Sequence, residues 1–220
     1  MKGKFITVEG VDGSGKSTLT AKLGKFLENA GYDVVLTTEP TDTWLGKNVK
    51  RAFDENLLPY SEVFLFLADR CEHTRQIKKE LDAGKIVLCD RYADSTYAYQ
   101  GAALEGYMEA PVEWLIEISR YIVIEPDLTL LLIARPEVVI ERITPRGSLT
   151  KFEKCEYLKK VHENYLMLSK KFSRIRVIDA ERKPEVVFED CRNAVVEYLR
   201  GQKNERVEDS AGLCASEYKT

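Results

Sequence analysis

Short runs of apolar residues alternate along this chain with longer segments in which apolar residues recur at helical spacing. The apolar runs are rich in β-branched residues and nearly continuous in hydrophobicity, as expected for strands buried on both faces of a sheet. They predict strands at residues 4–9, 33–38, 86–90, 128–134 and 175–179. The segments between them predict helices at residues 16–29, 61–83, 112–122, 136–143, 153–172 and 184–200.

This alternation of strands and helices predicts a single α/β domain over residues 1–200. Successive βαβ units build a mostly parallel sheet that helices cover on both sides, and such sheets bind ligands at the carboxyl ends of their strands. Residues 201–220 lose both the periodicity and the apolar content, so they predict a disordered tail outside the domain.

Composition and charge exclude several classes of function. The 33 basic and 36 acidic residues give a formal net charge of −3, so no broad basic surface for a nucleic-acid polymer is expected. The five cysteines are scattered without a CxxC pair, and only two histidines are present, which argues against a disulfide framework or a zinc site. No apolar stretch approaches the ~18 residues of a membrane helix. We expect a soluble, cytoplasmic protein that binds a small nucleotide and no membrane.

A phosphate-binding loop follows the first predicted strand. Residues 10–17 read GVDGSGKS, which matches G-x-x-x-x-G-K-[ST] between a strand and a helix, as a P-loop requires. In a P-loop the glycines turn backbone N–H groups onto phosphate oxygens, the lysine contacts the β- and γ-phosphates, and the serine hydroxyl binds Mg²⁺. The pattern therefore predicts Mg²⁺·ATP binding by residues 10–18: Gly10, Val11, Asp12, Gly13, Ser14, Gly15, Lys16, Ser17 and Thr18.

A second phosphate site is needed if the loop belongs to a kinase, because a kinase brings two polyanions together. No NKxD guanine-binding motif is present. Arg91 directly follows the third strand, and Arg70 lies four residues after Phe66, on the same face of a predicted helix. The Glu39-Pro40 turn ends the second strand. The alternatives are a core position for Phe66 and a simple ion pair at Asp90–Arg91.

With these motifs in this order, residues 3–200 resemble the thymidylate kinase family. The resemblance rests on five segments: GVDGSGKST (10–18), EPT (39–41), FLFLADR (64–70), DRYADSTYAYQG (90–101) and PEVVIERITPRGSLTKFE (136–153). It implies a P-loop NTPase fold, with three α/β/α layers, a mostly parallel five-stranded sheet and a lid at about residues 142–153. It also implies ATP-dependent phosphorylation of dTMP to dTDP by a homodimer.

The resemblance further implies roles for individual residues. Asp12 would lie between donor and acceptor, close to the metal; Phe66 would stack on the pyrimidine; Arg70 would bind the base edge; Arg91 would bind the acceptor phosphate. The rest of the dTMP site would be Glu39, Pro40, Ser95, Thr96, Tyr99 and Gln100, with Tyr99 where a ribose 2′-hydroxyl would otherwise lie. The implied catalytic set is Asp12, Lys16, Arg91 and Arg146, and the implied lid cations are Arg142, Arg146 and Lys151.

The chain also departs from the family pattern. Some members carry an arginine where this chain has Gly13, which leaves the lid cations, Arg146 first, to supply transition-state charge. Thr38, Ile133 and the Thr150-Lys151 pair stand where arginine, aspartate and an Asp-Arg pair are common. Arg142 and Arg146 could instead be solvated helix charges. Two other functions remain: a kinase for another nucleotide or small phosphorylated acceptor, and a non-catalytic ATP-binding regulatory module.

Overall fold

The computed structural model describes residues 3–55, 57–143 and 151–216. Its five strands form one sheet in the order β2-β3-β1-β4-β5, and every neighbouring pair is parallel. The strands are β1 (Lys4–Gly10), β2 (Val34–Thr38), β3 (Ile86–Asp90), β4 (Leu128–Ile133) and β5 (Ile175–Asp179). The five predicted strands are therefore confirmed to within one residue at each end.

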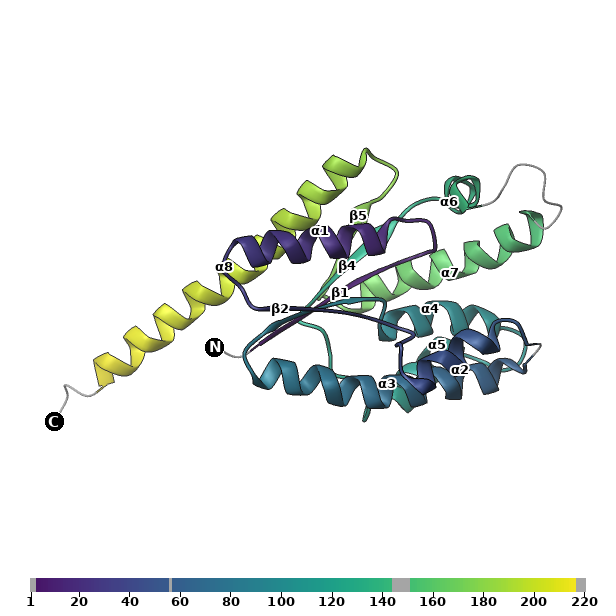
Figure 1. Ribbon diagram of the computed structural model, residues 1–220, viewed down its shortest axis with the longest axis horizontal. Coiled ribbons are helices and arrows are strands. Elements are labelled where there is room, and N and C mark those ends of the chain that lie inside the picture. The colour runs from purple at the N-terminus through teal and green to yellow at the C-terminus, as the bar shows by residue number, and fades with distance from the viewer. Residues whose placement is uncertain (1–2, 56, 144–150, 217–220) are drawn as a thin grey trace.

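Helices cover both faces of this sheet (Figure 1). They are α1 (Lys16–Asn29), α2 (Trp44–Ala52), α3 (Pro59–Asp82), α4 (Ala93–Ala103), α5 (Pro111–Ser119), α6 (Pro136–Ile143), α7 (Lys151–Lys171) and α8 (Pro184–Ser216). Helices α1 and α8 pack on one face, and α3, α4 and α7 pack on the other, which gives the expected three layers. Helix α2 packs on α3, α5 on α4 and α6 on α7.

The three central strands hold the core. All five residues of β3 are buried, as are six of the seven in β1 and five of the six in β4. This agrees with their nearly continuous apolar sequence, because each face of a central strand lies beneath a helix. Within the described part of the chain, no helix is both long and apolar enough to cross a membrane.

Two helices were missed by the sequence prediction. Helix α4 is buried on nearly every side between α3, α5, α7 and β1, so it lacks the polar stripe that marks an amphipathic helix. Tyr97 and Tyr99, whose alternation is also compatible with a strand, lie in this helix. Helix α2 spans only nine residues, and it begins after Thr43, whose side chain accepts a hydrogen bond from the backbone N–H of Gly46.

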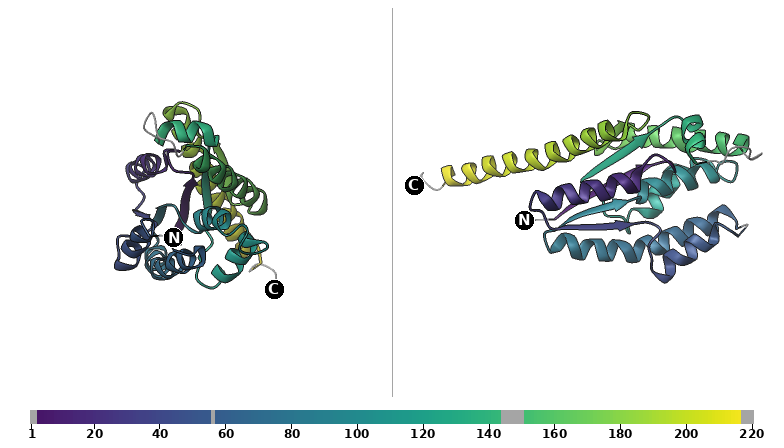
Figure 2. Two further views of the ribbon diagram at one scale, coloured as in Figure 1. Left: turned by 90° about the vertical axis from the view of Figure 1, so that its right-hand side faces the viewer. Right: turned by 45° about the horizontal axis from the view of Figure 1, so that its top comes forward.

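The last helix also differs from the prediction. It was expected to end at residue 200, whereas α8 continues to Ser216 and extends beyond the body of the protein (Figure 2). Residues 201–216 contain no proline, so no residue there removes a backbone donor from the helix.

Candidate functional site

The P-loop connects the central strand β1 to α1 at the carboxyl edge of the sheet. Gly10, Gly13 and Gly15 have φ angles of 138°, 80° and 96°, which glycine adopts without the steric penalty of a Cβ. Gly15 is the N-cap of α1, and no side chain caps this helix. The N–H groups of its first turn are therefore available to an anion, and the helix dipole favours one there.

The side chain of Lys16 folds back onto the P-loop. Its Nζ donates a hydrogen bond of 2.8 Å to the carbonyl oxygen of Val11, and the residue is 6% exposed. Burial, and after it the neighbouring Arg91 guanidinium, lower the pKa of Lys16 to about 8 against the opposing effect of Asp12. A polyphosphate beside this ammonium would favour its charged form.

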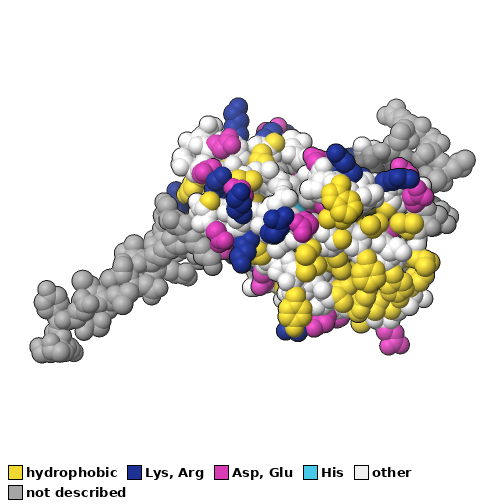
Figure 3. Space-filling view, turned by 60° about the horizontal axis from the view of Figure 1, so that its bottom comes forward, with side chains coloured by type: hydrophobic (Ala, Val, Ile, Leu, Met, Phe, Trp, Pro, Cys, Tyr) yellow, Lys and Arg dark blue, Asp and Glu magenta, His cyan; other side chains and the backbone are white. Residues whose placement is uncertain are grey.

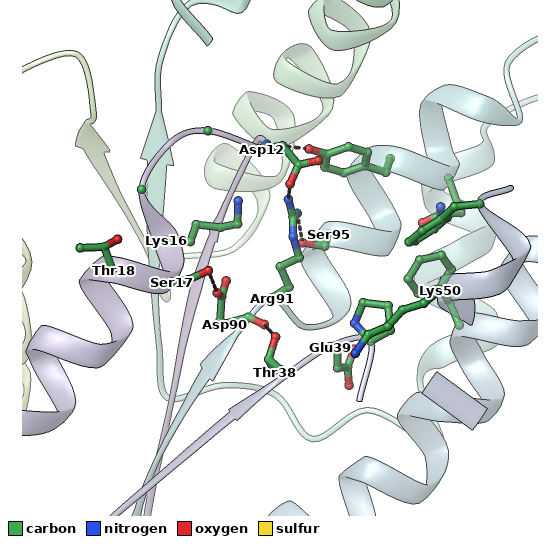
Figure 4. A pocket seen from close by; sticks show the side chains of 17 residues that line it. Asp12, Lys16, Ser17, Thr18, Thr38, Glu39, Lys50, Asp90, Arg91 and Ser95 are labelled. Carbon is green, nitrogen blue, oxygen red and sulfur yellow. Dashed lines mark hydrogen bonds and ion pairs between the residues drawn. The ribbon is translucent and has the colours of Figure 1, made fainter. Parts of the chain in front are cut away.

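Ser17 and Asp90 form the part of the site that fits a divalent cation. The Ser17 hydroxyl donates to Asp90 Oδ2 at 2.5 Å (Figure 4), and within the described part of the chain the other carboxylate oxygen of Asp90 is buried without a hydrogen-bond partner. One hydroxyl and one carboxylate are ligands that Mg²⁺ accepts when substrate phosphates and water supply the rest. Among the described residues, no cluster of three or more His, Cys, Asp or Glu side chains could hold a metal by itself. The residues present therefore fit Mg²⁺ bound together with ATP.

Arg91 connects the two halves of the site. Its φ of 67° is in the left-handed region, an uncommon conformation for a residue other than glycine. Nη1 donates to the Gly10 carbonyl at 3.2 Å and to Ser95 Oγ at 3.1 Å, while Nη2 pairs with Asp12. Burial raises the pKa of Asp12, but the positive charges of Arg91 and Lys16 outweigh it and lower the pKa overall. Because Arg91 pairs with Asp12, the simple Asp90–Arg91 ion pair is not the arrangement found.

A single hollow of about 700 Å³, which we call the main pocket, joins the P-loop to this arginine (Figure 4). It brings together most of the predicted donor and acceptor residues, namely Asp12, Gly13, Gly15, Lys16, Ser17, Thr18, Glu39, Pro40, Phe66, Arg91, Ser95, Tyr99 and Gln100. Thr38 and Asp90 line it as well. It also contains Lys50 and Phe53, which sequence reasoning missed because they lie in and just after the unpredicted helix α2.

Helix α3 forms hydrogen bonds and an ion pair with residues 39–43, the segment that follows β2. Asp69 accepts hydrogen bonds from the Thr41 N–H at 2.8 Å and from the hydroxyls of Thr41 and Thr43. Arg70 binds Glu39, and it also donates to the Tyr92 carbonyl at 3.1 Å and to Thr96 Oγ1 at 2.9 Å. Arg70 and Thr96 are buried and do not line the main pocket, and Arg70 Nη1 has no hydrogen-bond partner among the described residues.

A smaller hollow of about 330 Å³, the side pocket, lies on the other side of the P-loop. Ser14 and Thr18 contribute from the loop and α1, and Phe188 contributes from α8. Arg142 also lines it and donates a hydrogen bond of 3.1 Å to the Ala180 carbonyl. Of the other expected lid residues, Arg146 lies outside the described residues, and Lys151 is placed only as the first residue of α7.

Glu9 supports the site from beneath and was not found from the sequence. It is fully buried and accepts hydrogen bonds from the Tyr92 N–H at 2.8 Å, Ser95 Oγ at 2.5 Å and the Tyr165 hydroxyl at 3.3 Å. Burial, and after it the negative charge of Asp94, raise the pKa of Glu9 to about 7. The only sequence signal was its place at the end of an apolar strand.

Comparison with known proteins agrees with this geometry. The family model described as thymidylate kinase matches residues 8–191. A protein of Methanosarcina barkeri named "Probable thymidylate kinase" is 45% identical over 202 residues, which cover 90% of this chain and 98% of that protein. A protein of Pyrococcus horikoshii with the same name is 39% identical over 210 residues, covering 91% of this chain and all of that protein. The match extends over the P-loop, the main pocket and helix α3, and the chain therefore belongs to the thymidylate kinase family.

Proposed function

We propose that this protein transfers the γ-phosphoryl group of ATP to dTMP, forming dTDP and ADP. The observation that carries the proposal is the main pocket, in which Lys16 from the donor loop and Arg91 from the end of β3 face one space (Figure 4). Lys16 and Arg91 follow the neighbouring strands β1 and β3, and two cations placed in this way suit two phosphate groups that must approach each other. Membership of the thymidylate kinase family supports dTMP as the acceptor.

On the donor side, the P-loop N–H groups and Lys16 would bind the β- and γ-phosphates. Ser17 and Asp90 would hold Mg²⁺, which neutralises developing phosphate charge when it is bound. The side pocket lies next to the same loop, so we assign it to the nucleoside part of ATP, where Arg142 and Phe188 offer a guanidinium and an aromatic ring.

On the acceptor side, Phe66 offers a ring for the pyrimidine, and the centroids of Phe66 and Phe53 are 6.0 Å apart. Arg91 would hold the acceptor phosphate, since its guanidinium is already oriented by Gly10, Ser95 and Asp12. The Tyr99 hydroxyl accepts a hydrogen bond of 3.1 Å from the backbone N–H of Asp12, and this contact holds the ring beside the proposed sugar position. This placement favours a deoxyribose over a ribose.

Phosphoryl transfer needs alignment and charge neutralisation rather than covalent catalysis. Lys16 and Arg91 neutralise the donor and acceptor phosphates, and Asp12 fixes the position of Arg91 between them. The lid cations Arg142, Arg146 and Lys151 would add positive charge around the transferring phosphoryl group. They would also exclude water, which would otherwise compete as the acceptor.

A coupled ADP-release assay with Mg²⁺·ATP and a panel of nucleoside monophosphates tests the proposal. We expect strong preference for dTMP over dCMP, UMP and AMP. Lys16→Ala and Arg91→Ala should each reduce kcat/KM at least ~100-fold, because each removes a cation from a charge-neutralising site. Arg75→Ala, on the exposed face of α3, is the matched control and should leave the rate unchanged.

The other outcomes separate the alternatives. Preference for a different monophosphate would retain the phosphotransfer mechanism and move the substrate assignment to another acceptor. ATP binding without turnover on any acceptor would support the regulatory module. A well-folded Arg91→Ala enzyme with full activity would refute the acceptor-phosphate assignment.

We also propose that the protein is a homodimer in the cytoplasm. Apolar side chains gather over α2 and the first half of α3 (Figure 3). Trp44, Leu58 and Phe64 in this region are 71%, 64% and 59% exposed, which is unusual for a monomer. A second copy of the chain would bury them, and Phe64→Glu should shift the mass measured by light scattering from dimer to monomer. The four described cysteines are free thiols, which supports a reducing compartment.

A further inference from the structure

Glu39 uses both of its carboxylate oxygens on two residues of α3. Oε2 accepts from Arg70 Nε at 2.9 Å and from Arg70 Nη2 at 2.6 Å, while Oε1 lies 2.8 Å from His73 Nδ1. All three side chains are at most 3% exposed. Arg70 and His73 are three residues apart on the helix, so they meet the carboxylate from adjacent turns.

The hydrogen-bond chemistry determines how the His73 ring is oriented. An ionised carboxylate can only accept, so Nδ1 of His73 carries the proton that it shares with Glu39. Nε2 then lies 2.7 Å from the hydroxyl of Thr37. The imidazole therefore bridges Thr37 and Glu39 at the end of β2, and it holds the carboxylate in one rotamer.

The same network holds Arg70 in place through Nε and Nη2 and does not engage Nη1. Arg70 Nη2 contacts Glu39, the Tyr92 carbonyl and Thr96, whereas Nη1 is buried and has no partner among the residues that the structure describes. Buried guanidinium N–H groups are normally paired, so an unpartnered one indicates a place for a ligand oxygen. Phe66, one turn earlier on the same face of α3, lines the main pocket where the acceptor base is assigned.

We infer that His73 is a positioning residue for substrate selection: through Glu39 it fixes the Arg70 guanidinium so that the enzyme accepts a pyrimidine with a carbonyl at the base edge. This inference rests on the proposed dTMP kinase activity. A guanidinium donates and never accepts, so it binds the carbonyl of thymine and opposes the amino group of cytosine. If the Glu39–His73 contact is lost, the carboxylate can rotate and Arg70 can turn with it, which weakens this selection.

Two near-isosteric substitutions distinguish the contacts of His73. In His73→Asn the side-chain amide can occupy the position of Nδ1 and still donate to Glu39. In His73→Gln the amide reaches the position of Nε2, so it contacts Thr37 and not Glu39. His162→Gln is the matched control, because it changes the second histidine of the chain, which lies on α7.

The experiment compares kcat/KM for dTMP with kcat/KM for dCMP in each purified enzyme, together with its thermal midpoint. We expect the dTMP-to-dCMP ratio to fall by about tenfold or more in His73→Gln, mainly through a higher KM for dTMP, because a hydrogen-bonding site loses its alignment. The ratio should stay within about threefold of wild type in His73→Asn and in the control. A general loss of stability would instead lower kcat for both substrates together.

The failures are distinguishable. A wild-type enzyme that shows no preference for dTMP would overturn the proposed function and this inference with it. A wild-type preference that His73→Gln retains in full, or that both His73 variants lose equally, would overturn the inference alone. Nitrogen NMR of the wild-type enzyme needs no substitution: a proton on Nδ1 of His73 is expected, and a bare Nδ1 would refute the contact on which the inference rests.

Discussion

Replacing Glu9 with glutamine should change how the stability of this protein depends on pH. Glu9 is completely buried, and burial raises its pKa from 4.5 to about 7, with Asp94 as the second cause. The folded state therefore holds a proton on this carboxyl that the unfolded chain releases between about pH 4.5 and pH 7. A group of this kind stabilises the fold below its unfolded pKa, and that stabilisation is lost as the pH rises through the folded pKa.

The size of the effect follows from the two pKa values. With 4.5 unfolded and about 7 folded, Glu9 contributes roughly 2.5 kcal/mol more stability at pH 5 than at pH 8, at roughly 1.4 kcal/mol per pH unit. Glutamine cannot ionise, so Glu9→Gln removes this dependence. The glutamine side chain forms less favourable hydrogen bonds with Tyr92, Ser95 and Tyr165. The resulting loss of stability is independent of pH, so it lowers the free energy of unfolding by the same amount at every pH.

Urea unfolding followed by circular dichroism at pH 5 and pH 8 measures the quantity directly. The free energy of unfolding of Glu9→Gln, minus that of wild type, should rise by roughly 2.5 kcal/mol from pH 5 to pH 8. Other titrating groups are present in both proteins and cancel in the difference. Glu28→Gln, on the exposed face of α1, is the control and should show the same difference at both pH values. Parallel pH profiles for wild type and Glu9→Gln would refute a protonated Glu9 in the folded protein.

Three further predictions concern the pocket and its frame. Arg91→Lys should lower kcat/KM for dTMP about 100-fold in the ADP-release assay, because a single ammonium cannot replace a fork with several directed donors; near-normal activity would contradict this. Asp90→Asn should raise the Mg²⁺ concentration for half-maximal activity about tenfold or more, since Ser17 would lose its charged partner; an unchanged Mg²⁺ titration would exclude Asp90 from the metal site. Gly10→Ala should lower the free energy of unfolding by about 3 kcal/mol in urea, because φ is 138° and the added Cβ would lie 2.4 Å from the Leu132 carbonyl oxygen; an unchanged unfolding midpoint would show that the loop relaxes.

The phosphate-binding half of the site could be predicted from the sequence because its physics is local. Gly10, Gly13 and Gly15 supply the positive φ angles, and the strand and helix that the loop joins are adjacent in the chain. The five strands were equally clear, since short β-branched runs without polar alternation are characteristic of a sheet buried on both faces. The positions of Arg91 and Phe66 at the main pocket followed from the resemblance of their segments to one family.

The contacts that complete the site depended on the tertiary structure. Ser17 and Asp90 are 73 residues apart, and Arg91 and Asp12 are 79 apart, so only the sheet order, with β1 beside β3, decides which side chains meet. Sequence spacing places Asp90 next to Arg91 but cannot show that each pairs with the P-loop instead.

Helix α4 and the buried hydrogen-bonded groups also depend on tertiary packing, so the sequence alone did not predict them. Packing hides every face of α4, and this removes the polar stripe by which a helix is recognised in sequence. The buried partners of Glu9, and the bridge from His73 through Glu39 to Arg70, arise from elements that are distant in the chain. Local sequence therefore determined which residues could bind phosphate. Long-range packing decided how these residues are oriented and which neighbouring groups influence their charge.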